Sequence, residues 1–108
     1  MVIQRGDEPK RRLRVNDDGT GALTLAPMER IELALGAKDE ACSATWAGYL
    51  VKDGVLSDLP VGASLDPSGT FYWQTGPGFA GNFSLLFVRT NCRGEKQQVP
   101  VAVTIPLK

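Results

Sequence analysis

The stretch that decides the fold is residues 59–83, which read LPVGASLDPSGTFYWQTGPGFAGNF. It alternates turn residues with short runs of aromatic or aliphatic side chains. Beyond Pro60, its glycines and prolines are Gly62, Pro67, Gly69, Gly76, Pro77, Gly78 and Gly81. Glycine carries a high backbone entropy cost in a helix and proline removes an amide donor, so no helix of useful length forms here. The stretch therefore predicts β structure.

The flanking sequence predicts further short strands. Residues 28–36 contain good helix formers, but Ile31, Leu33 and Leu35 recur at the two-residue period of a strand. We expect a strand there because turn residues on both sides leave only a strand-length space. The other expected strands begin at Leu13 and Leu23 or cover residues 43–51, 55–56, 70–74, 82–90 and 99–105.

The last part of the chain predicts an antiparallel hairpin. Apolar side chains occupy every second position from Val99 to Ile105, and the turn residues 91–94 join this strand to 82–90. Pro100 cannot donate to a strand ladder, so we expect it at an edge position or a bulge. The alternation also predicts a core between two sheets, formed by Phe71, Trp73, Phe83, Leu85, Val101 and Val103.

Length and composition indicate one domain. The chain has 108 residues, 43% of them hydrophobic, which suffices for a single core. Residues 1–12 carry mixed charges and are expected to be a linker or a disordered lead-in. Residues 13–108 are expected to form a β-sandwich of about seven antiparallel strands, separated by turns roughly every 8–12 residues.

The charge balance excludes some partners. Twelve basic and twelve acidic residues cancel, whereas nucleic-acid binding relies on a large positive field. No run of apolar residues is long enough to span a membrane, so direct membrane insertion is not expected. The polar start does not resemble a signal peptide. This leaves a cytosolic protein or a fragment of a longer secreted chain, and we favour the fragment.

Cys42 and Cys92 are the only cysteines and form a candidate disulfide. Such a bridge would close a loop of roughly 50 residues and stabilise the fold by about 4 kcal/mol in the chain-entropy model. Two unrelated thiols are the alternative, because sequence alone does not place them together. With no histidine and no Cys-x-x-Cys spacing, we expect neither a metal site nor another cofactor.

The chain lacks the groups that catalysis commonly needs. A Ser-His-Asp mechanism requires a base, and the sequence contains no histidine. Asp66 is the best carboxylate by position, but in Leu-Asp-Pro-Ser-Gly it is expected to cap a turn. The oxygens of residues 16–21 are expected to serve a hairpin turn, since a calcium loop would need more ligands. We therefore do not expect an enzyme.

Two groups of side chains are candidates for binding. Strand 82–90 is apolar on both faces, so Leu86 and Val88 form a partner patch unless loops of the same domain cover them. Trp46, Tyr49 and Tyr72 are candidates for stacking on sugar rings, which makes carbohydrate binding the alternative function.

Residues 59–105 carry a pattern of turns and strands that resembles a known family. The pattern is Leu59-Pro60-x-Gly62-x-x-Leu65-Asp66-x-x-Gly69-x-Phe71-x-Trp73, then Gly76-Pro77-x-Phe79-x-Gly81-x-Phe83, a strand, Arg89-Thr90-Asn91, Gly94 and a final valine strand. It is similar to the immunoglobulin-like and cadherin-like repeat modules of bacterial surface and secreted proteins. The acidic clusters of calcium-binding cadherin junctions are absent here, so no bound calcium is expected.

The resemblance implies an immunoglobulin-like β-sandwich and a non-catalytic role. Modules of this family act as spacers, adhesin segments or partner-binding units in long multidomain proteins. We therefore expect a structural or protein-binding module of a larger bacterial protein that is extracellular, attached to the cell surface or periplasmic. Its expected partners are neighbouring domains of the same chain or another protein.

Overall fold

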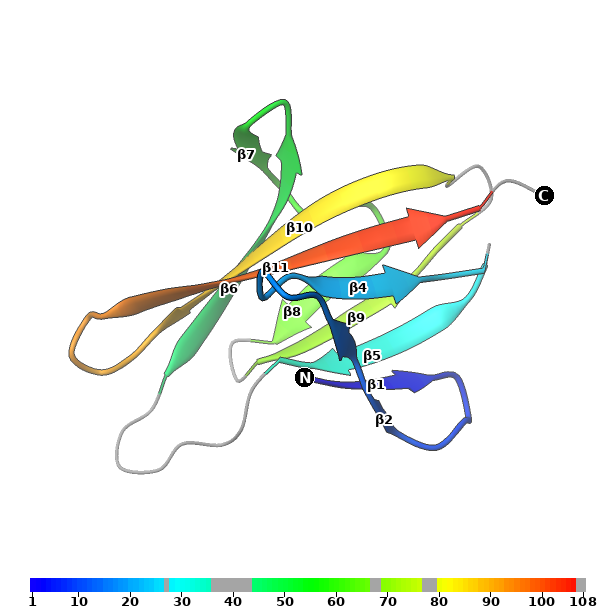
Figure 1. Ribbon diagram of the computed structural model, residues 1–108, viewed down its shortest axis with the longest axis horizontal. Coiled ribbons are helices and arrows are strands. Elements are labelled where there is room, and N and C mark those ends of the chain that lie inside the picture. The colour runs from blue at the N-terminus through cyan, green and yellow to red at the C-terminus, as the bar shows by residue number, and fades with distance from the viewer. Residues whose placement is uncertain (27, 36–43, 67–68, 77–79, 107–108) are drawn as a thin grey trace.

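The computed structural model describes residues 1–26, 28–35, 44–66, 69–76 and 80–106. Within these residues the chain is all-β, with eleven strands in two sheets and no helix that could cross a membrane (Figure 1). The first sheet has five strands and the second has six, and this arrangement is compatible with a β-sandwich.

The first sheet has the strand order β2-β1-β5-β9-β8, and all its neighbouring strands are antiparallel. Its strands are β1 (Val2–Arg5), β2 (Arg11–Arg12), β5 (Arg30–Ala34), β8 (Ala63–Asp66) and β9 (Thr70–Gln74).

The second sheet has the order β3-β4-β11-β10-β6-β7. Its strands are β3 (Arg14–Val15), β4 (Gly21–Thr24), β6 (Thr45–Lys52), β7 (Val55–Ser57), β10 (Gly81–Thr90) and β11 (Lys96–Ile105). Strand β4 runs parallel to β11, while the other neighbouring strands of this sheet are antiparallel.

The core lies between the sheets and is built on aromatic side chains. The Phe71 ring meets the Phe87 ring edge to face with centroids 5.1 Å apart, so the two sheets touch through these residues. Trp73 is fully buried and donates a hydrogen bond from Nε1 to the Val61 carbonyl oxygen at 3.3 Å. Five of the six expected core residues are buried, namely Phe71, Trp73, Leu85, Val101 and Val103.

Phe83 is the exception among the expected core residues. It is half-buried and packs against the edge of the core, with its ring perpendicular to that of Trp73 at 5.7 Å. Its register is inward as expected, opposite Val103 and near the first residue of β10.

Most of the expected strands are confirmed, including the ambiguous segment that becomes β5 and the hairpin of β10 and β11. Pro100 lies one residue before the part of β11 that pairs with β4, so it occupies a local edge as expected. Strand β8 was not expected, because Ala63–Asp66 lies among turn residues and its only apolar side chains are those of Ala63 and Leu65.

The lead-in differs from its expectation as a linker or disordered segment. Residues Val2–Arg5 form β1, which pairs with β5, and Ile3 is 5% exposed. Arg5 forms an ion pair with Glu29 at 2.9 Å. A strand of four residues turns only one or two side chains inward, too few for a recognisable period. Its pairing with β5 and the burial of Ile3 therefore explain its order, and neither can be read from the lead-in itself.

Candidate functional site

The three candidates for sugar stacking lie in three different environments. Trp46 turns inward and packs against the core beside Gly69. Tyr49 lies on the outer face of the second sheet, opposite Leu86. Tyr72 lies on the outer face of the first sheet and is 42% exposed. The structure does not bring these aromatic side chains together, and Tyr72 lines a groove.

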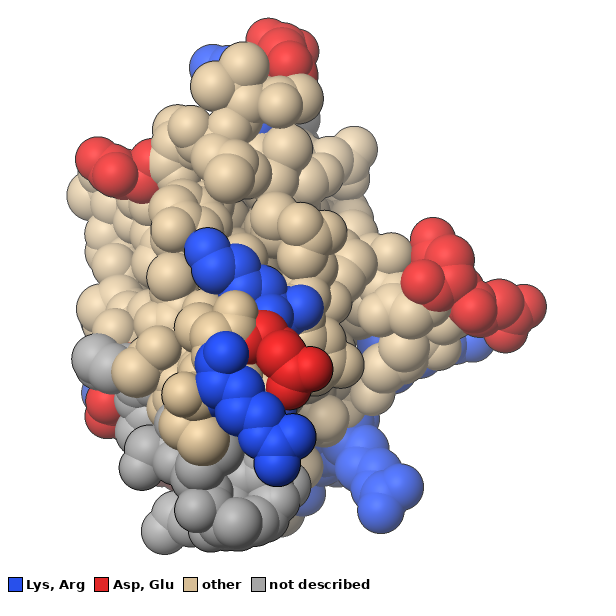
Figure 2. All heavy atoms as spheres, turned by 90° about the vertical axis from the view of Figure 1, so that its left-hand side faces the viewer, with Lys and Arg blue, Asp and Glu red and all other residues tan. Residues whose placement is uncertain are grey.

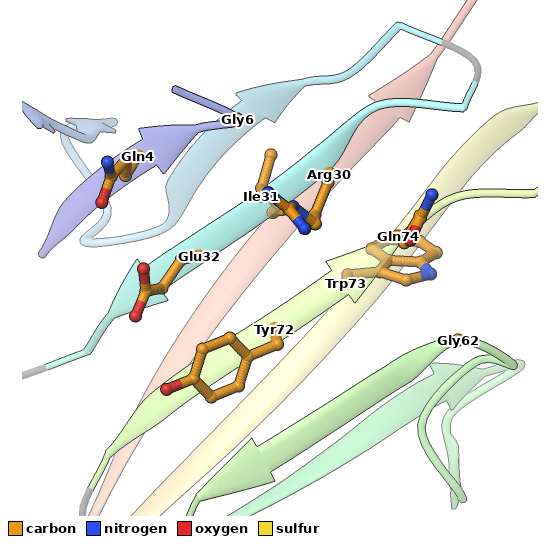
Figure 3. A pocket seen from close by; sticks show the side chains of 9 residues that line it. All are labelled: Gln4, Gly6, Arg30, Ile31, Glu32, Gly62, Tyr72, Trp73 and Gln74. Carbon is orange, nitrogen blue, oxygen red and sulfur yellow. The ribbon is translucent and has the colours of Figure 1, made fainter. Parts of the chain in front are cut away.

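The groove around Tyr72 crosses the outer face of the first sheet and has a volume of about 410 Å³ (Figure 3). We call it the Tyr72 groove. The side chains at its surface come from three adjacent strands: β1, β5 and β9. Its polar members besides Tyr72 are Gln4, Arg30, Glu32 and Gln74.

Strand alternation places these side chains outward. In β9, Phe71 and Trp73 are buried while Tyr72 and Gln74 are exposed, as the two-residue period requires. In the neighbouring strands Glu32 lies opposite Tyr72, and Gln4 lies opposite Glu32. Directly opposed residues of antiparallel strands lie about 4.5–5.5 Å apart, so these three side chains form one row across the sheet.

The polar groups of the Tyr72 groove keep their hydrogen-bonding capacity. Within the described part of the chain, the side chains of Gln4, Arg30, Glu32, Tyr72 and Gln74 make no hydrogen bond or ion pair. Arg5, at the end of β1, is by contrast paired with Glu29. The groove thus offers both donors and acceptors to a ligand.

Sequence reasoning found Tyr72 but missed its polar neighbours. The alternation of residues 30–34 and 70–74 puts Glu32 and Tyr72 on outward positions. That they lie opposite each other depends on which strands pair, and the sequence does not encode this locally. Gln4 was missed because its segment was expected to be a lead-in.

A second surface lies on the outer face of the second sheet, and we call it the apolar face. Leu86 and Val88 point outward from β10 and are half-exposed. Leu86 lies between Pro100 of β11 and Tyr49 of β6, and Ala47 lies opposite Val88. The expected partner patch therefore extends over three strands.

Cys92 lies in the turn between β10 and β11 and is disulfide-bonded. The other cysteine of the chain, Cys42, falls outside the described residues. The pairing of Cys42 with Cys92 stays a prediction.

Residues 16–20 form a turn as expected. The Gly19 amide donates to the Asn16 carbonyl oxygen at 2.9 Å, and the Thr20 amide donates to Asp18 Oδ1 at 2.9 Å. Hydrogen bonds from Thr20 lower the pKa of Asp18, because they favour its ionised form. At Asp66 the main-chain carbonyl oxygen accepts from the Gly69 amide at 2.8 Å, and the expected cap by the Asp66 carboxylate stays a prediction. Among the described residues, no group of three acidic, cysteine or histidine side chains is arranged to hold a metal ion.

No protein-family model matches this chain, and no curated protein matches it either. The described residues define the chain as an all-β protein with two sheets, compatible with a β-sandwich. Any assignment beyond this class rests on strand order and surface chemistry.

Proposed function

We propose that the chain is an immunoglobulin-like domain. In immunoglobulin folds one sheet contains strands A, B, E and D, and the other contains G, F and C, with C′ added in the variable type. The order β1-β5-β9-β8 corresponds to A-B-E-D, and β11-β10-β6-β7 corresponds to G-F-C-C′. This correspondence of both sheets supports the assignment more strongly than the number of strands does.

The function that we propose is a non-catalytic structural or protein-binding module of a larger extracellular, surface-attached or periplasmic bacterial protein. The observation that carries it is the apolar face. Its half-exposed side chains form two adjacent rows, Pro100-Leu86-Tyr49 and Val88-Ala47, on the long central strands of the second sheet.

An apolar surface of this kind favours a protein partner. Aromatic and aliphatic side chains without charges are typical of the centre of an interface, whereas charged side chains belong to its rim. Figure 2 shows Lys and Arg side chains beside Asp and Glu side chains on one face of the molecule. Charges of both signs together do not create the field that a nucleic acid requires. We therefore propose a neighbouring domain or another protein as the partner.

The proposal is tested by replacing Leu86 and Val88 together with threonine. Threonine keeps β propensity and removes apolar surface, so the double variant is expected to retain its thermal stability and to lose association. Association is measured by light scattering over a range of concentrations and by pull-down with the neighbouring domains of the parent chain.

The matched control is Val61→Thr, because Val61 is 81% exposed and precedes β8 in the other sheet. It should leave both stability and association unchanged. If the double variant loses stability while association persists, Leu86 and Val88 belong to the core of this domain and the proposal fails. An unmodified domain that associates with nothing in these measurements also contradicts it.

A further inference from the structure

We propose that the Tyr72 groove binds a neutral oligosaccharide, with the Tyr72 ring as the platform for one sugar ring. This inference is independent of the proposed function, because the groove lies on the first sheet and the apolar face lies on the second. It rests on the exposure of Tyr72, on the unpaired polar groups around it and on the balance of charge in the groove.

The Tyr72 ring is presented as a stacking surface. Figure 3 looks onto the outer face of the first sheet and shows the ring face on, lying along β9 beside Glu32. The face of an aromatic ring is electron-rich. The C–H groups on one side of a sugar ring are weakly positive and apolar, so they stack on such a face. Tyr72 is 42% exposed on this polar sheet face, so part of its ring is accessible to a ligand.

The groups around Tyr72 suit hydroxyl ligands. Each sugar hydroxyl both donates and accepts a hydrogen bond, and planar amide, carboxylate and guanidinium groups can bind two neighbouring hydroxyls at once. The groove supplies the two amides of Gln4 and Gln74, the carboxylate of Glu32 and the guanidinium of Arg30. None of the four uses its side chain in a hydrogen bond or ion pair within the described residues.

The charges in the groove favour a neutral ligand. Arg30 and Glu32 lie on the same face of β5, so a cation or an anion bound there would meet a like charge. A second hollow of about 280 Å³ shares Gln4 and Glu32 with the first and is also lined by Lys10 and Thr70. Each hollow is thus lined by one basic side chain and by the shared carboxylate of Glu32, so neither sign of charge dominates either hollow.

The size and position of the groove favour an oligosaccharide over a peptide. The two hollows, of about 410 and about 280 Å³, adjoin. Taken together, their volume lies within the range of about 300–1,000 Å³ that is typical of small-molecule sites. An added peptide strand needs a free sheet edge. Strands β5 and β9, which carry Glu32 and Tyr72, are paired on both sides, so a peptide strand cannot be added beside Tyr72.

The test is an NMR titration of the isotope-labelled domain with four neutral tetrasaccharides, built from glucose, mannose, xylose or N-acetylglucosamine. At least one of them is expected to shift backbone amide signals in β1, β5 and β9 at millimolar concentration. Tyr72→Ala should weaken this binding about tenfold, the equivalent of one lost stacking contact. Tyr72→Phe keeps the platform and should bind nearly as well as the unmodified domain.

The matched control is Tyr49→Ala, which removes a half-exposed tyrosine from the opposite sheet and should leave binding unchanged. The inference is overturned when none of the four sugars shifts the groove amides, or when Tyr72→Ala, with its folded spectrum intact, binds as tightly as the unmodified domain. An anionic tetragalacturonate that binds more tightly than every neutral sugar would also overturn it. Should Tyr72→Ala unfold, Glu32→Gln and Gln74→Ala provide the same comparison at outward-facing positions of the groove.

Discussion

Gly69, just before β9, lies against the indole of Trp46. Its φ of +106° is a backbone conformation that side chains other than glycine rarely adopt. A Cβ atom at this position would lie 2.7 Å from Trp46 Nε1 and 2.9 Å from Cδ1. The close approach of the indole to the backbone therefore requires glycine at position 69.

Gly69→Ala is expected to destabilise the domain by about 2–4 kcal/mol, since the positive φ and the displacement of Trp46 each carry a cost. Gly94→Ala is the control, because Gly94 has a similar positive φ of 84° but nothing within 4 Å of the added methyl group. It should cost about 1–2 kcal/mol. Denaturant unfolding measures both free energies. Equal losses in the two variants would mean that contact with Trp46 does not matter.

The strand β1 extends the first sheet and carries one side of the Tyr72 groove. Ile3 points into the core and Gln4 points into the groove, so a single short strand contributes to both packing and the candidate site. Its amide and carbonyl groups pair with β5 on one side and with β2 on the other.

Ile3→Ala is expected to lower the free energy of unfolding by about 2–5 kcal/mol, as for other buried aliphatic side chains. Gln4→Ala, at the next position and facing outward, should change stability by less than about 0.5 kcal/mol. Denaturant unfolding again provides the measurement. If Ile3→Ala lowers the free energy of unfolding as little as Gln4→Ala does, β1 does not contribute to the core and is only loosely attached to the domain.

The elements that could be predicted are those with a countable period. Strands β5, β9, β10 and β11 alternate over five or more residues, and this alternation also identified five buried core residues. The short strands β1 and β8 are ordered by pairing with neighbours that are distant in sequence, so no local pattern marks them. The Tyr72 groove could not be predicted for the same reason, because its side chains form a row only when β1, β5 and β9 pair in the folded sheet.

For the molecule as a whole, the disulfide is the strongest covalent constraint that we expect. We predict that Cys42 and Cys92 are bridged, which is consistent with the bonded state of Cys92 and with the two cysteines of the chain. Intact mass after alkylation should then show no added groups without reductant and two with it. Reduction should destabilise the domain by up to about 4 kcal/mol.

The double variant Cys42→Ala with Cys92→Ala controls for other effects of the reductant, and its unfolding should not respond to it. Full alkylation of the unmodified protein without reductant would disprove the bridge.

The parallel pairing of β4 with β11 has a mechanical consequence. Gly21–Thr24 lies alongside Val101–Thr104, with both strands running in the same direction. A force that pulls the two ends of the chain apart draws β4 backward and β11 forward, so the strands slide past each other and all their hydrogen bonds are strained at once. In the antiparallel hairpin of β10 and β11, by contrast, a pull at the open end breaks the bonds one after another. We therefore expect the pairing of β4 with β11 to resist a pulling force more strongly than the hairpin of β10 and β11 does.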